Sequence, residues 1–276
     1  MLCYSTGSLP DGLPLSGIAD ILTPTPFTGV ELVITAGMLA RAGDAAYWRN
    51  AREEFQSLGL AFRNVHLGAP HLMGPEPHRP GLSSLDPAAR ERKTAAAERC
   101  LAIAEALGAP HLTLTTGLAD SESSRGPQAD AFRGALARLV RQAPGSVKIM
   151  IEQEPEHVVH SAELLAALGR EFPGDVFANF DVGHSHVLGE DIGAAIRLLG
   201  PMLRNVHLED ILGRVHAHKL YGDGDVDFDA VFAALREIGY RGDYTPDLYP
   251  FKDAYGRAIE ASSAFLRKHG VLAGAL

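Results

Sequence analysis

Short apolar runs recur along the chain, and a segment with the apolar spacing of a helix follows most of them. The runs GVELVIT at 29–35 and KIMIE at 148–152 are rich in apolar residues, as buried strands are. The predicted strands cover residues 2–5, 29–35, 61–66, 111–115, 148–152, 176–180 and 243–248, and one more, seventh in chain order, contains His207.

Helical segments separate these strands. In the longest, residues 86–107, apolar residues at 100, 103, 104 and 107 share a face, Asp86 is suited to cap the start and Gly108 to end it. The predicted helices cover residues 15–22, 44–58, 86–107, 161–170, 192–199 and 253–269, with two more marked by Ala131, Leu136 and Leu139 and by Phe228, Val231, Phe232 and Leu235.

Eight strands alternating with eight helices, without a long linker or a break in composition, predict one (β/α)8 barrel, a TIM barrel, over residues 1–276. An open dinucleotide-binding sheet is the weaker alternative, because no GxGxxG motif follows the first strand. Residues 67–85 contain four prolines and predict a lid-like loop, whose His71 and His78 we expect to be solvated. Residues 121–126 also predict a loop.

The composition limits the classes of partner that the protein is expected to bind. With 25 Lys and Arg against 34 Asp and Glu the net charge is −9, and no block of basic residues predicts a nucleic-acid surface. Cys3 and Cys100 cannot form a disulfide framework, and Cys100 lies in an apolar helical stripe. The sequence has neither an export signal nor an apolar run of membrane-spanning length, so we expect a soluble cytoplasmic protein with no membrane partner. The sequence does not determine the oligomeric state, and a homo-oligomer is one possibility.

Four polar residues terminate consecutive predicted strands: Glu152, Asp181, His207 and Asp247. They are separated by 29, 26 and 40 residues, close to one strand-helix unit each, so a barrel would aim all four at one point on its C-terminal face. Three converging carboxylates repel one another unless a cation lies between them, and carboxylates with an imidazole suit a divalent metal. The alternative is that each acid caps a helix and the histidine is an ordinary strand residue.

The stretch 204–228 holds two further histidines, His216 and His218, in a loop after His207. Gly222 and Gly224 give that loop backbone freedom, and Asp227 is suited to cap the following helix. We expect His207 to be the metal ligand and the other two to lie at the rim, with His216 on the loop surface.

Six motifs carry a family resemblance: GVEL at 29–32, IE at 151–152, DVGH at 181–184, VHLED at 206–210, HKLYGDGDVDF at 218–228 and GYRGDYTPDLY at 239–249. With these the sequence resembles the xylose isomerase-like barrel superfamily, which holds sugar isomerases and epimerases, inosose dehydratases and endonuclease IV-type nucleases.

The resemblance implies a metal-dependent isomerase or epimerase acting on a sugar, ketose or related polyol by proton abstraction beside a carbonyl. Its implied metal ligands are Glu152, Asp181, His207 and Asp247. Glu152 and Asp247 would form the acid/base pair, and His184, His66 and His218 would contact substrate, or a second metal in the case of His184 and His218. The implied cofactor is one divalent ion, Mn²⁺ by expectation, with Mg²⁺, Co²⁺, Fe²⁺ and Zn²⁺ as alternatives.

Two departures from the family pattern keep other functions open. Asp247 stands where the family has Glu, which shortens the side chain by one methylene. The nuclease pattern has a DxH pair where this chain has His216-Ala217-His218, and a histidine where Thr115 and Thr116 stand. The alternatives are a dehydratase of a cyclic polyol, a phosphodiesterase acting on abasic DNA, and a barrel that binds without catalysis.

Overall fold

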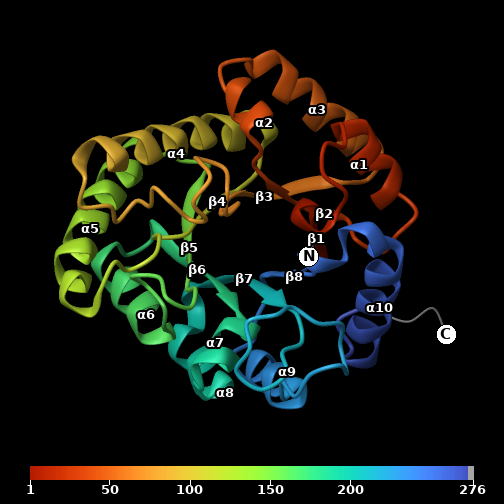
Figure 1. Cartoon of the computed structure of the whole chain (residues 1–276). Helices are drawn as coiled ribbons and strands as arrows, with labels where there is room; N and C mark the ends of the chain where they lie inside the picture. Colours follow the sequence, from red (N-terminus) through yellow and green to blue (C-terminus); the bar gives the residue numbers. More distant parts are fainter. Residues whose placement is uncertain (273–276) are drawn as a thin grey trace.

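Eight parallel strands surround a central axis in the computed structural model, which describes residues 1–272 (Figure 1). The strands are β1 (Cys3–Ser5), β2 (Gly29–Val33), β3 (Ala61–Leu67), β4 (His111–Leu114), β5 (Lys148–Glu152), β6 (Val176–Asp181), β7 (Leu203–Leu208) and β8 (Asp243–Pro246). Each pairs with the next in chain order, and a bridge between Leu2 and Tyr244 brings the ends of the sheet together. The chain forms the (β/α)8 barrel that its sequence predicts.

A layer of helices surrounds the sheet (Figure 1). They are α1 (Leu15–Leu22), α2 (Ala36–Ala40), α3 (Ala45–Ser57), α4 (Pro87–Leu107), α5 (Arg125–Gln142), α6 (Ala162–Glu171), α7 (Val182–Leu188), α8 (Ile192–Leu199), α9 (Phe228–Glu237) and α10 (Tyr255–Lys268), with 3-10 turns η1 (Thr6–Ser8), η2 (Glu122–Ser124), η3 (Gly200–Met202) and η4 (Tyr249–Ala254). Their inner faces bury large side chains such as Trp48, Phe132 and Phe232 against the strands. No helix within residues 1–272 is long and apolar enough to cross a membrane.

The main errors of the sequence-based assignment lie where side chains cap helices. Strand β2 ends at Val33 rather than Thr35, because the Thr35 side chain accepts a hydrogen bond from the backbone of Met38 and starts α2. Helix α7 was also not predicted, and Asp181 caps it. The 3-10 turn η2 covers Glu122–Ser124 and α5 begins at Arg125, so most of the loop expected at 121–126 is helical. Strand β8 ends at Pro246, which leaves Asp247 one residue beyond it.

The loop between β3 and α4, residues 68–86, begins at the C-terminal end of β3 and contains no regular strand or helix. Arg79 pairs with Asp120 at 2.6 Å, and the backbone N–H of Ser83 donates to Thr116. The expectation that both histidines of this loop are solvated is wrong for His78, whose side chain is only 19% exposed and lies beside Glu154. Tertiary contacts across the barrel mouth bury it.

Candidate metal centre at the barrel mouth

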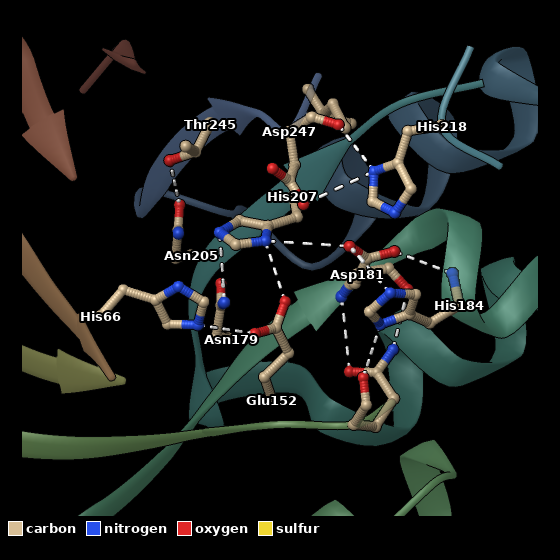
Figure 2. A network of polar contacts seen from close by, with 12 residues as sticks. His66, Glu152, Asn179, Asp181, His184, Asn205, His207, His218, Thr245 and Asp247 are labelled. Atoms are coloured by element: carbon tan, nitrogen blue, oxygen red, sulfur yellow. Dashed lines mark hydrogen bonds and ion pairs between the residues drawn. The ribbon is translucent and has the colours of Figure 1, made fainter. Parts of the chain in front are cut away.

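The four strand-end residues converge at the C-terminal end of the barrel (Figure 2). Glu152 ends β5, Asp181 ends β6, His207 is the penultimate residue of β7, and Asp247 follows β8. Nδ1 of His207 lies 2.9 Å from Oε1 of Glu152 and 3.8 Å from Oδ2 of Asp181. One ligand atom from each of Asp181, His207 and Asp247 lies within 4.8 Å of the other two.

The hydrogen bonds of His207 fix which of its ring nitrogens is free. Nε2 lies 2.9 Å from Oε2 of Glu31, a carboxylate that can only accept, so in the neutral ring that binds a metal Nε2 would carry the proton and Nδ1 would be the nitrogen with a free lone pair. The amide of Asn179 is 3.2 Å from the same Nε2 and its oxygen has no partner, so the amide orientation with the oxygen toward Nε2 satisfies both groups. In that neutral form the lone pair of Nδ1 would face Glu152 and Asp181.

A polar layer beneath the mouth holds Glu31 in place. Its Oε2 accepts from the amides of Asn64 at 2.7 Å and Asn205 at 3.3 Å, in addition to His207. Thr113 donates to Asn64, and Thr245 donates to Asn205. A carboxylate on the far nitrogen of a ligand histidine is the usual support of protein metal sites.

The residues present fit one divalent ion. Asp181 uses Oδ1 to cap α7, accepting from the backbone N–H of His184 at 2.8 Å, while its buried Oδ2 has no hydrogen-bond partner among the described residues. Nδ1 of His207 is likewise buried and without hydrogen-bond geometry to any described group. The capping and metal-binding interpretations of Asp181 are therefore compatible, since each uses a different oxygen. Three carboxylates with one imidazole form a donor set suited to manganese, magnesium or iron.

Burial and neighbouring charges act against each other in this cluster. Burial would raise the pKa of Glu152, but the charges of His207 and His66 outweigh it and hold that pKa well below its usual range. Burial would lower the pKa of His207, but Glu31 and Glu152 hold it well above its usual range. For Asp247, burial prevails and raises the pKa.

The three histidines expected to contact substrate all lie at the mouth. Nε2 of His66, on β3, is 2.8 Å from Oε2 of Glu152, so it orients that carboxylate. The buried ring of His184 is held by its Nδ1, 2.8 Å from the carbonyl of Gln153. The buried ring of His218 is held in the same way, 2.7 Å from the carbonyl of Asp247.

His216, expected on the loop surface, is exposed, but its ring packs against that of His184 with centroids 4.7 Å apart. Its Nε2 lies 3.1 Å from Nε2 of His218. One ring nitrogen from each of His184, His216 and His218 lies within 4.8 Å of the others. His216 and His218 from the loop, together with His184 from α7, therefore form a three-histidine group beside the four-residue centre.

The loop that carries His216 and His218 is held in place by Asp210. Its Oδ2 accepts from the backbone N–H groups of Gly222 and Gly224 at 2.8 and 3.0 Å, and Oδ1 accepts from those of Ile211 and Val226. One buried carboxylate thus organises the backbone between β7 and α9.

The family of the chain follows from comparison with known proteins. A family model described as "Xylose isomerase-like TIM barrel" matches residues 25–269. The chain belongs to the xylose isomerase-like TIM barrel family. A sequence search among curated proteins finds no match.

Solved structures share the fold of this xylose isomerase-like barrel at low identity. A D-tagatose 3-epimerase-like protein is 18% identical, with 98% of both chains covered and a TM-score of 0.78. An IolI protein with a bound zinc atom is 17% identical, with 97% of this chain and 98% of the other covered and a TM-score of 0.78. A D-psicose 3-epimerase from Clostridium cellulolyticum H10, solved with D-tagatose, is 15% identical, with 98% and 95% covered and a TM-score of 0.74.

Sequence reasoning missed two buried acids of this barrel. Glu31 interrupts the apolar run of β2, and an acid inside a buried strand was the available signal. Glu209 is fully buried, and a Cβ on Gly183 would overlap its Oε1, so the close packing of α7 on this carboxylate requires glycine. Burial and the charge of Asp181 raise the pKa of Glu209 well above its usual range.

Proposed function

We propose that the protein is a divalent-metal-dependent isomerase or epimerase that acts on a ketose or related polyol by proton abstraction beside a carbonyl. The observation that carries this proposal is the placement of two carboxylates, Glu152 and Asp247, on either side of His207 (Figure 2). They come from β5 and from the residue after β8, with Asp181 and His207 on the strands between. A substrate carbon held between them would meet a carboxylate on each face.

In this proposal Glu152 and Asp247 do the proton chemistry. One carboxylate removes a carbon-bound proton, and the other returns a proton to the opposite face, which inverts the carbon, or to the neighbouring carbon, which moves the carbonyl. His66 holds Oε2 of Glu152 at 2.8 Å, so the carboxylate is oriented before substrate binds. The ion, held by Glu152, Asp181, His207 and Asp247, would polarise the substrate carbonyl.

The solved structures support this direction, because neighbours with the same fold include a D-tagatose 3-epimerase-like protein, a D-psicose 3-epimerase and an IolI protein with zinc. We propose Mn²⁺ as the ion, since carboxylates outnumber imidazoles in the donor set. Metal analysis of the purified protein, followed by removal and replacement with single ions, tests this choice. Equal activity with every ion would argue against it.

The reaction is tested by solvent exchange. The Mn²⁺-loaded protein is incubated in D2O with D-psicose, D-tagatose, D-fructose, L-erythrulose or inosose, and deuterium at carbons beside the carbonyl is followed by NMR. We expect incorporation with at least one ketose, loss of exchange after chelation and recovery with added Mn²⁺. Absence of exchange with every ketose and with inosose would contradict the proposal.

Product analysis separates the related reactions. An epimer or an aldose indicates proton return, whereas loss of water from inosose indicates the dehydratase alternative, which also begins with proton abstraction. A protein that retains no metal and exchanges no hydrogen fits the binding barrel.

Phosphodiester hydrolysis at abasic DNA is a second candidate, favoured by the group His184, His216 and His218, which would shift the donor set toward zinc. The acidic balance of the chain, with its net charge of −9, opposes it. A nicking assay on an abasic duplex with Zn²⁺ decides the matter, because nicking by the wild type would favour the nuclease.

A further inference from the structure

A second polar cluster lies beside the candidate metal centre and is not used by the proposed chemistry. It consists of His78, from the loop between β3 and α4, with Glu154 and His157, from the segment after β5. Glu154 comes two residues after Glu152, which corresponds to about 7 Å along an extended chain. Glu152 and Glu154 therefore lie on one short segment at the C-terminal end of β5, so the two clusters border the same mouth.

His157 supports the carboxylate from the buried side. The backbone N–H of Gly117 donates to its Nδ1 at 3.3 Å, so the neutral ring carries its proton on Nε2. That Nε2 faces Oε2 of Glu154 at 3.2 Å, and both atoms are buried without another partner among the described residues. A protonated nitrogen has no lone pair for a metal, so His157 lies against Glu154 as a polar neighbour and not as a metal ligand.

The other oxygen of Glu154 faces His78 across a gap. Nε2 of His78 is 3.6 Å from Oε1, which is too far for a hydrogen bond but suits a bridging oxygen at hydrogen-bond distance from both. The two side chains are 19% and 13% exposed, in contrast to the 1% of His157. Burial and the charge of Lys93 lower the pKa of His78 to about 4, so the ring is neutral near pH 7 and carries one proton.

The two groups that border this gap, a carboxylate oxygen and an imidazole nitrogen, suit a hydroxyl group as ligand. A hydroxyl can donate to Oε1 of Glu154 and at the same time accept from Nε2–H of His78. A phosphate would meet the carboxylate charge, and a metal would find no free nitrogen on His157. The ring of His78 is fixed for this task by edge-to-face packing on His157, with centroids 4.9 Å apart.

We propose that His78, Glu154 and His157 form a subsite that binds an uncharged hydroxyl at the far end of the substrate carbon chain and so selects longer, unphosphorylated polyols. This inference rests on the proposed function. His78 and Glu154 contact the hydroxyl, and His157 positions Glu154.

The test compares two substrates of different chain length and substitutions at two residues, Glu154 and His78. The specificity constant kcat/KM is measured with Mn²⁺-loaded wild type, Glu154→Gln and His78→Asn, using D-psicose, with six carbons, and L-erythrulose, with four. Glu156→Gln is the matched control, since Glu156 is an exposed carboxylate in the same loop. Asparagine is chosen at position 78 because the residue has φ 56°, which asparagine tolerates.

We expect Glu154→Gln to lower kcat/KM for D-psicose by about 10- to 100-fold, as loss of a hydrogen bond to a charged group does, and to leave L-erythrulose within about twofold. His78→Asn should act in the same direction, and Glu156→Gln should change neither substrate. Metal per chain should equal that of the wild type in all variants. Thermal melting verifies that each variant is folded.

Three results would overturn the subsite alone: no loss with D-psicose in either folded variant, an equal loss with both substrates, or loss of a bound metal ion in Glu154→Gln. Wild-type protein that exchanges no hydrogen with any ketose of the panel or with inosose overturns the proposed function, and the subsite with it.

Discussion

Glu31 offers the sharpest test of the candidate metal centre, because it contacts neither metal nor substrate in the proposed arrangement. Its Oε2 accepts from Nε2 of His207 at 2.9 Å and thereby keeps the lone pair on Nδ1, which faces the carboxylates. Glu31→Gln keeps an acceptor at that position if the amide oxygen replaces Oε2, but removes the charge. Glu31→Ala removes the acceptor and leaves the amides of Asn64 and Asn205 without it.

The expected loss follows from this geometry. Removing the partner of a ligand histidine weakens metal binding by about 10- to 100-fold, which corresponds to roughly 1.4 to 2.8 kcal/mol. We expect Glu31→Gln near the lower value and Glu31→Ala near the upper one. Competition with a fluorescent chelator measures the Mn²⁺ affinity, and nitrogen-15 NMR of the metal-free protein reports whether His207 carries its proton on Nε2.

The control is Glu190→Gln, which changes a hydrogen-bonded carboxylate that accepts from Ser185 and from the backbone of Ala162. This variant should bind Mn²⁺ with wild-type affinity. Wild-type affinity in both folded Glu31 variants would refute the argument, as would an NMR spectrum of the wild type in which the neutral ring of His207 carries its proton on Nδ1 and not on Nε2.

Three further predictions concern the mouth and its supports. Glu152→Gln should lower turnover by about 10²- to 10⁴-fold in protein that retains its metal, and unchanged turnover on the true substrate would remove Glu152 from the acid/base role. Gly183→Ala should destabilise the fold by about 1 to 3 kcal/mol in a urea titration, because the added methyl overlaps the buried Glu209, whereas Gly134→Ala, in an open helical position, should be neutral or stabilising. Asp210→Ala should lower the melting temperature and speed hydrogen exchange at residues 211–226, and unchanged exchange would show that the loop does not depend on this carboxylate.

Much of the candidate site could be predicted because the side chains at the ends of parallel strands share one edge of the barrel. The spacing of Glu152, Asp181, His207 and Asp247 by roughly one strand-helix unit was enough to bring them together. The same reasoning does not extend to Glu31, whose role depends on contact with a residue 176 positions later in the chain.

The conformation of the loops also depends on contacts between residues that are distant in the chain. A proline-rich loop predicts solvated histidines, yet the position of His78 is decided by Glu154 and His157, which reach it across the mouth from the segment after β5. Short helices such as α2 escaped prediction because one capping hydrogen bond from Thr35, and not a run of periodic residues, starts them. Neither a contact across the barrel mouth nor a single capping hydrogen bond produces a hydrophobic pattern that can be recognised in the sequence.

The sequence by itself determined the barrel, the order of its strands and the four polar residues that face its mouth, because apolar periodicity and strand-end position are local properties of the chain. Only the tertiary structure decided which nitrogen of His207 carries the proton, which oxygen of Asp181 caps a helix and which gap between Glu154 and His78 suits a hydroxyl. Those features depend on distances of a few ångströms between groups on different strands and loops, and such distances are set by packing.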